Sequence, residues 1–285
     1  MTAVVLDGIV LGLQFGLLGV GLTIVYGMGG ILNLAYGQMA VVAAIVVSFG
    51  LKWGLSAVPA AVLGIVTAAV IGLALNLTVL KPVYRRQGEG RVLLSLLVTI
   101  GVAFIIDGLL VWRFPLEALG LSVGGDPVSI LGVPMRTGSL LASAITILAG
   151  GSLILFFRAT TSGKAIRSVI QDEVGAQLCG VNPAAVRTLI FTLSGALAGL
   201  VAVTQSMTSP VTISSGFDIT ILALLVTVVG GLGSIRGAFL AGLILGMVNA
   251  ASSFYIGSYI TTIILLAAAA LTILIRPSGL FGKHA

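Results

Sequence analysis

A group of polar side chains interrupts an apolar stretch near the N-terminus. Asn33, Tyr36 and Gln38 follow the glycine pair Gly29 and Gly30 in the run YGMGGILNLAYGQM. Irregular backbone and polar groups are tolerated at membrane depth where they line a cavity, so a helix broken here indicates a solute site. The same side chains could instead make hydrogen bonds between helices. The sequence alone leaves both interpretations open.

Asp107 is a carboxylate inside another apolar run. An ionisable residue within a membrane segment is costly and suggests a functional role. We therefore take Asp107 as a further, weaker candidate for the solute path. It could instead reach the membrane interface or pair with Arg113.

Chemistry that needs several metal ligands or bases is not expected. Cys179 and His284 are the only cysteine and the only histidine, so we expect no metal site built on these residue types. An integral membrane enzyme would need converging acids, bases or ligands, which the apolar runs lack. Ser162-Gly163-Lys164 lacks the upstream Gly and the following Ser or Thr of a phosphate-binding loop, so no ATP site is predicted.

Residues 160–185 form the most informative polar segment, TTSGKAIRSVIQDEVGAQLCGVNPAA. Ser162 suits the N-cap of a helix that reaches Cys179, Gly180 suits its left-handed end, and Asn182 caps the next helix with Pro183 at its first position. Such a helix, joined directly to an apolar run, indicates a docking site for a cytoplasmic partner. A passive channel would not need it. Its mixed charges fit protein contact better than lipid headgroups. The candidate docking residues are Gly163, Lys164, Arg167, Asp172, Glu173 and Gly180.

The elements that position these residues are membrane helices. Of 285 residues 58% are hydrophobic and 8% are charged, against about 25% charged in soluble domains. Runs near the roughly 20 residues of a spanning helix lie at 8–27, 31–51, 55–80, 92–112, 138–157, 187–206, 217–235, 237–256 and 258–275. We predict an all-α fold, one polytopic membrane helix bundle over 1–285 with about 8–10 segments, some of them discontinuous. The net charge of +6 lies in short loops, so nucleic acid is not an expected partner.

Charge in the loops predicts an orientation. Strict alternation places eleven basic residues on one side: Lys81, Arg85, Arg86, Arg91, Arg158, Lys164, Arg167, Arg187, Arg236, Arg276 and Lys283. The other side has Lys52, Arg113 and Arg136. Because positive loops stay in the cytoplasm, we expect the N-terminus outside and the C-terminus inside.

Small residues recur every four positions in several segments, for example Gly8, Gly12 and Gly16, and Ala238, Gly242 and Gly246. Such faces let helix backbones approach closely, so helix packing is their expected role. The segment 230–237 has four glycines in eight residues and predicts a tight turn on the cytoplasmic side.

Four motifs in this order resemble the branched-chain amino acid permease family of ABC importers, in particular the smaller of its two permease subunits. They are GLTIVYGMGGILNLAYGQM (21–39), GKAIRSVIQDEVGAQLCGVNPAAV (163–186), VVGGLGSIRGAFLAGLILGMVNA (228–250) and RPSGLFG (276–282). The resemblance implies a bacterial inner-membrane subunit that carries branched-chain or other hydrophobic amino acids. It also implies a second homologous permease, two cytoplasmic ATPases that hold ATP and Mg²⁺, and a periplasmic solute-binding protein. No cofactor is expected on this chain itself.

The chain departs from the family pattern at candidate solute-lining positions. Tyr36 stands where His is usual, Gln38 where an acidic residue is usual, and Leu222 where Lys is common. Asp107 replaces a polar uncharged residue. Related members carry urea, short amides or aromatic acids, so these remain alternative solutes.

Overall fold

The structure is a computed structural model that describes residues 1–27, 30–86, 88–114, 118–121, 126–130, 132–276 and 278–282. Gly29, Lys283 and His284 lie outside these residues. The long helices are α1 (Thr2–Tyr26), α2 (Tyr36–Lys52), α3 (Ala57–Thr78), α4 (Glu89–Arg113), α5 (Thr137–Ala159), α8 (Pro183–Thr208), α9 (Ser215–Gly230), α10 (Ile235–Tyr255) and α11 (Ser258–Ile275). Shorter helices are α6 (Thr161–Gln171), α7 (Glu173–Leu178) and the 3₁₀ turn η1 (Val83–Arg85).

Each predicted apolar run overlaps one of the long helices, which confirms the all-α membrane bundle. Within the described residues seven helices are long and apolar enough to cross a membrane, while α2 and α9 have 17 and 16 residues. The predicted segment 31–51 is only partly helical, because residues 31–35 have no regular structure or form a turn before α2 begins. Short strands occupy the loops at one end: β1 (Ala118–Leu119) pairs with β4 (Val211–Thr212), and β2 (Val128–Ile130) with β3 (Val133–Met135), both antiparallel.

Helix α1 lies at the centre of the bundle, with 89% of its most apolar window buried against 17% for α4 and α11. Its glycine face meets the glycine face of α10 at backbone distance. A Cβ added to Gly246 would lie 2.2 Å from Gly12 Cα, and one added to Gly242 would lie 2.2 Å from Gly16 N. These contacts confirm helix packing as the role of the small-residue spacing.

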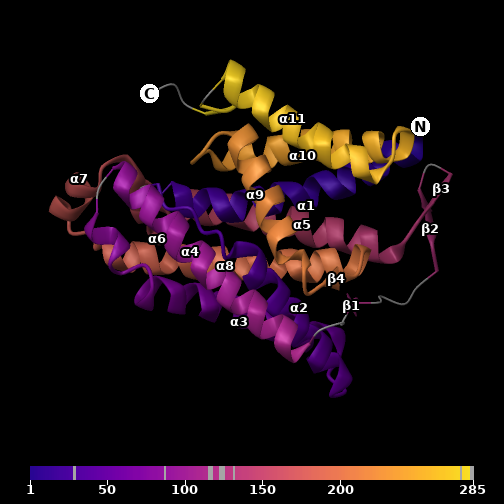
Figure 1. The fold of residues 1–285 in the computed structure, drawn as a ribbon, viewed down its shortest axis with the longest axis horizontal. Coiled ribbons are helices and arrows are strands. Elements are labelled where there is room, and N and C mark those ends of the chain that lie inside the picture. The colour runs from indigo at the N-terminus through magenta and orange to yellow at the C-terminus, as the bar shows by residue number, and fades with distance from the viewer. Residues whose placement is uncertain are drawn as a thin grey trace.

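The loops that join the helices gather at two opposite ends of the bundle (Figure 1). At one end Met1 lies beside the end of α10, where Met1 Sδ is 3.0 Å from Tyr255 Oη, and the β2–β3 hairpin lies at the same end. At the other end lie α6, α7, η1 and the turn before α10. The predicted glycine turn is confirmed at residues 231–234, and Leu280 N–H donates to Val229 O beside it. The loops predicted to share a side therefore share an end of the bundle.

Candidate translocation and coupling sites

Residues 31–35 are irregular backbone that runs along the first half of α4. Leu34 N–H donates to Thr99 Oγ1 at 3.0 Å, and the same hydroxyl lies 3.1 Å from Leu32 O. Leu32 N–H lies 3.3 Å from Ser95 Oγ. Unpaired backbone groups are costly inside a membrane, so these hydroxyls stabilise a break that the helix ladder cannot satisfy. The predicted helix break is thus present, and its partners come from α4.

The three candidate path residues around this break are enclosed by the chain itself. Asn33, Tyr36 and Gln38 are exposed by 0%, 0% and 1%. Asn33 Oδ1 accepts from Ala35 N–H at 3.1 Å, which fixes the turn before α2. Among the described residues, Tyr36 Oη and both polar atoms of the Gln38 amide have no hydrogen-bond partner. Asn33 therefore has a local structural role, whereas the Tyr36 hydroxyl and the Gln38 amide are buried polar groups whose hydrogen bonds are not made within the described residues.

The starts of α2 and α9 meet at this break. Gly37 N–H donates to Thr220 Oγ1 at 2.9 Å, and that hydroxyl lies 3.3 Å from Leu34 O. A Cβ on Gly37 would lie 1.8 Å from Gly216 O. Two short apolar helices thus begin side by side with almost no space between their backbones.

Asp107 is not joined to this group. It is half-buried on α4, and its Oδ1 has no partner among the described residues. Within the described residues no ion pair joins Asp107 to Arg113. The Arg113 guanidinium instead lies 5.2 Å from the centre of the Phe114 ring. The structure therefore brings Asn33, Tyr36 and Gln38 together and leaves Asp107 apart.

The polar segment predicted as one docking helix is two helices. Thr160, not Ser162, is the N-cap of α6, because its Oγ1 accepts from Gly163 N–H at 2.9 Å. Asp172 has extended backbone and caps α7 through Val174 N–H at 3.0 Å, so the predicted continuous helix to Cys179 is wrong. A buried apolar stripe on α6, including Ile166 and Val169, holds it against the bundle.

The other predicted ends of this segment are as expected. Gly180 has φ +83°, in the left-handed region, and Asn182 Oδ1 accepts from Ala184 N–H at 3.0 Å with Pro183 at the first helical position. Lys164, Arg167, Asp172 and Gly180 are exposed, Glu173 is half-buried and Gly163 is buried. A Cβ on Gly163 would lie 2.3 Å from Phe156 O, so this glycine lets α6 pack on the end of α5.

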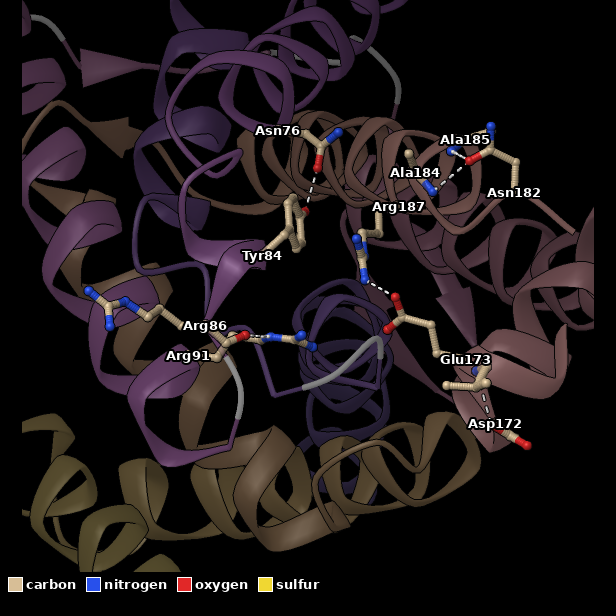
Figure 2. A network of polar contacts seen from close by, with 11 residues as sticks. Asn76, Tyr84, Arg86, Arg91, Asp172, Glu173, Asn182, Ala184, Ala185 and Arg187 are labelled. Atoms are coloured by element: carbon tan, nitrogen blue, oxygen red, sulfur yellow. Dashed lines mark hydrogen bonds and ion pairs between the residues drawn. The ribbon is translucent and has the colours of Figure 1, made fainter. Parts of the chain in front are cut away.

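A polar network ties α7 to the bundle (Figure 2). Glu173 forms an ion pair with Arg187 in the first turns of α8, and the Arg187 guanidinium lies 4.4 Å from the centre of the Tyr84 ring. Tyr84 Oη donates to Asn76 Oδ1 at the end of α3, and Asn76 Nδ2 donates to Thr188 Oγ1 at 3.0 Å. Burial raises the pKa of the Tyr84 phenol, while the positive charges of Arg187 and Arg91 act in the opposite direction. Tyr84 therefore stays a neutral donor.

Two cavities lie at opposite ends of the bundle. One of about 440 Å³ is lined by Tyr26, Gly27, Gly30, Ile170, Leu232, Gly233 and Ser234, so the glycine break, α6 and the glycine turn meet around it. The other, of about 580 Å³ near the N-terminus, includes Asp7, Arg136, Asn249 and Ser253 in its walls. Sequence reasoning missed this second cavity, and also Ser95, Thr99, Thr220, Asn76 and Tyr84. Serine and threonine in an apolar helix give no sequence signal that separates these roles from ordinary helix hydrogen bonds.

Comparison with known proteins agrees with the fold and the motif order. Residues 4–276 match the family model described as branched-chain amino acid transport system / permease component. The chain is 28% identical to the high-affinity branched-chain amino acid transport system permease protein BraD of Pseudomonas aeruginosa, over 97% of this chain and 94% of that protein. The figures are the same for the permease protein LivH of Escherichia coli. The solved structure of PsaBC from Streptococcus pneumoniae in complex with Fab shares the fold, with a TM-score of 0.54 and 12% identity over 95% of this chain and 91% of that one. The chain therefore belongs to the permease-component family of branched-chain amino acid transport systems, as a multi-pass membrane subunit of an ABC transporter and not as an enzyme.

Proposed function

We propose that this chain is a membrane subunit of an ATP-driven importer that moves branched-chain or other hydrophobic amino acids across the bacterial inner membrane. The observation that carries this proposal is the α6–α7 segment, in a chain that belongs to this permease family. Val174 and Leu178 of α7 are 67% and 86% exposed, and Lys164 and Arg167 of the preceding helix α6 are also exposed. Apolar side chains so exposed among charges are typical of a protein contact.

The contact partner is a cytoplasmic ATPase subunit. The Glu173–Arg187 pair links α7 to α8, and α8 packs along α3. A displacement of α7 by the ATPase therefore also displaces α8. The complete importer has two such ATPases, which bind ATP and Mg²⁺, a second homologous permease and a periplasmic solute-binding protein. Alternating access then follows from nucleotide-driven movement of the docking segment.

The orientation of the subunit is N-terminus outside and C-terminus in the cytoplasm. Cys179 tests it without any substitution, because it is the single cysteine and is exposed at the end of α7. In membranes from cells that make the permeases without the ATPases, a membrane-impermeant maleimide should label Cys179 in inside-out vesicles and leave it unlabelled in sealed right-side-out vesicles. Labelling from the outside would contradict the orientation.

The solute path runs beside the break before α2, with Tyr36 and Gln38 as its polar groups and Asn33 holding the turn. Asp107 is a weaker candidate on the uncovered part of α4. Neutral hydrogen-bonding groups suit a zwitterionic or neutral solute in transit, because a strong fixed charge would hold it. Because Tyr36 packs against Gly21 of α1 and Gln38 against Gly216 of α9, the path opens here only when these helices move apart from α2.

Uptake into proteoliposomes tests the proposal directly. The permease, its partner permease and the ATPases are reconstituted with the binding protein outside and ATP inside. Leucine, isoleucine, valine and phenylalanine should accumulate only with ATP. Uptake confined to urea, acetamide or benzoate would correct the solute and keep the importer. Equilibration of solutes without ATP would instead indicate a channel.

A further inference from the structure

A small basic cavity opens where α3 and α8 meet at the α7 end of the bundle. It has a volume of about 170 Å³ and is lined by Asn76, Leu77, Lys81, Tyr84, Ala184, Arg187 and Thr188. Two of these side chains are cationic and none is a carboxylate, while Tyr84, Asn76 and Thr188 add polar groups. The first turns of α8 add the positive end of a 26-residue helix. The lining is therefore complementary to an anion.

Glu173 offsets part of the positive charge of this cavity through its ion pair with Arg187. Its own side chain lines a neighbouring cavity of about 430 Å³ and not this one. Arg187 lines both cavities, and its guanidinium has five N–H donors, more than one carboxylate engages. Nε of Arg187 has no hydrogen-bond partner among the described residues. An anion could therefore share Arg187 with Glu173.

The cavity is placed for a lipid. Its wall residue Leu77 is 55% exposed, and Val66 and Val70 on the same helix are 51% and 54% exposed. An uncovered apolar stripe of α3 thus leads along the membrane to the basic groups. Pockets for whole small molecules have volumes of about 300–1,000 Å³, so this cavity suits a headgroup whose chains lie outside it.

We propose that this cavity binds the phosphate of an anionic phospholipid from the cytoplasmic leaflet. Lys81 and Arg187 hold the phosphate, and the acyl chains lie along Val66, Val70 and Leu77. The bound lipid then fills the junction between α3, η1 and α8 through which the Arg187 network connects α7 to the bundle. The binding site does not depend on which solute the transporter carries.

Native mass spectrometry of the purified transporter complex tests the site. Phosphatidylglycerol is titrated against phosphatidylcholine with the same acyl chains and against inorganic phosphate. The variant is Lys81→Gln, and the matched control is Arg86→Gln, an exposed cation of the same end that does not line the cavity. One basic residue contributes about fivefold in affinity for an anionic membrane lipid.

We expect phosphatidylglycerol to bind more tightly than phosphatidylcholine, Lys81→Gln to weaken it about fivefold, and Arg86→Gln to leave it unchanged. Phosphatidylglycerol should also raise the thermal stability of the wild type more than that of Lys81→Gln. Equal affinity for both lipids, or equal loss in both variants, would overturn the proposal. Displacement of the lipid by millimolar inorganic phosphate would assign the cavity to free phosphate instead.

Discussion

The break before α2 and the α6–α7 segment both interrupt the long helices, but they differ in the burial of their polar side chains. At the break Asn33, Tyr36 and Gln38 are fully enclosed, and the backbone is satisfied by hydroxyls of α4 and α9. In the α6–α7 segment most polar side chains are exposed, and one ion pair, Glu173–Arg187, holds it to α8. The first region is held by close packing on all sides, whereas in the second the buried apolar stripe holds α6 and the ion pair holds α7. Substitutions should therefore affect assembly in the first region and coupling in the second.

Adding a methyl group to the contact between α2 and α9 should have the largest effect on stability. Gly37→Ala would place a methyl group 1.8 Å from Gly216 O, so the two backbones must separate, at a cost of about 1–3 kcal/mol or more. Thermal stability in detergent and size-exclusion chromatography measure the loss. Gly90→Ala in the first turn of α4 is the control, because no heavy atom lies within 4 Å of an added Cβ. Equal stability of both variants would show that α2 and α9 are not packed this closely.

Breaking the Glu173–Arg187 pair should have the next largest effect, and on coupling more than on folding. Glu173→Gln leaves Arg187, whose side chain is 12% exposed, without its carboxylate, at a cost of about 1–3 kcal/mol. We expect ATP hydrolysis to continue while solute moved per ATP falls. Asp172→Asn is the control, since Asn also caps helices and Asp172 is exposed.

Stronger disruption of the same segment sharpens this comparison. Charge reversal at both Asp172 and Glu173 should uncouple hydrolysis from uptake with the bundle still folded. Gly163→Pro should also uncouple them, but it displaces α6 from α5 because it adds a side chain 2.3 Å from Phe156 O and removes the N–H that Thr160 caps. Wild-type transport in all these variants would remove the docking role of α6 and α7.

Asn33→Leu should have a moderate effect on assembly. The substitution removes the acceptor of Ala35 N–H and leaves a buried donor unpaired, which costs about 1–3 kcal/mol if no other group replaces it. Folded yield and melting temperature measure this cost. Normal yield together with lost uptake would instead assign Asn33 to the solute path.

Gln38→Met should have the smallest effect on stability. The Gln38 amide has no partner among the described residues, so an apolar side chain of similar shape should be neutral or slightly stabilising. Uptake is the informative measurement. Lower uptake with unchanged stability would support Gln38 as a path residue, whereas wild-type uptake would remove it from the path.

The sequence predicted the parts of the fold that depend on local pattern. Apolar run length located each long helix of the described residues, and Gly180 and Asn182 have the local geometry that their residue types favour. The α6–α7 division was missed because Asp172 was interpreted as a surface charge, although Asp is also a favoured N-cap. The burial of Tyr36 and Gln38 and the roles of Ser95 and Thr99 depend on which helices become neighbours. The local pattern of a single sequence does not show which helices become neighbours.

The hydrogen bonds of the break before α2 also bear on how the chain enters the membrane. The partners of Leu32 and Leu34 lie 63 and 65 residues later on α4, and Thr220 Oγ1 beside Leu34 O lies 186 residues later. During synthesis the break therefore exists long before the groups that satisfy it. Its amides must stay hydrated or bound within the insertion machinery until α4 arrives, because bare lipid offers them no partner. The native packing of α2 is thus completed only after α9 has been inserted, which makes this region a late step of biogenesis.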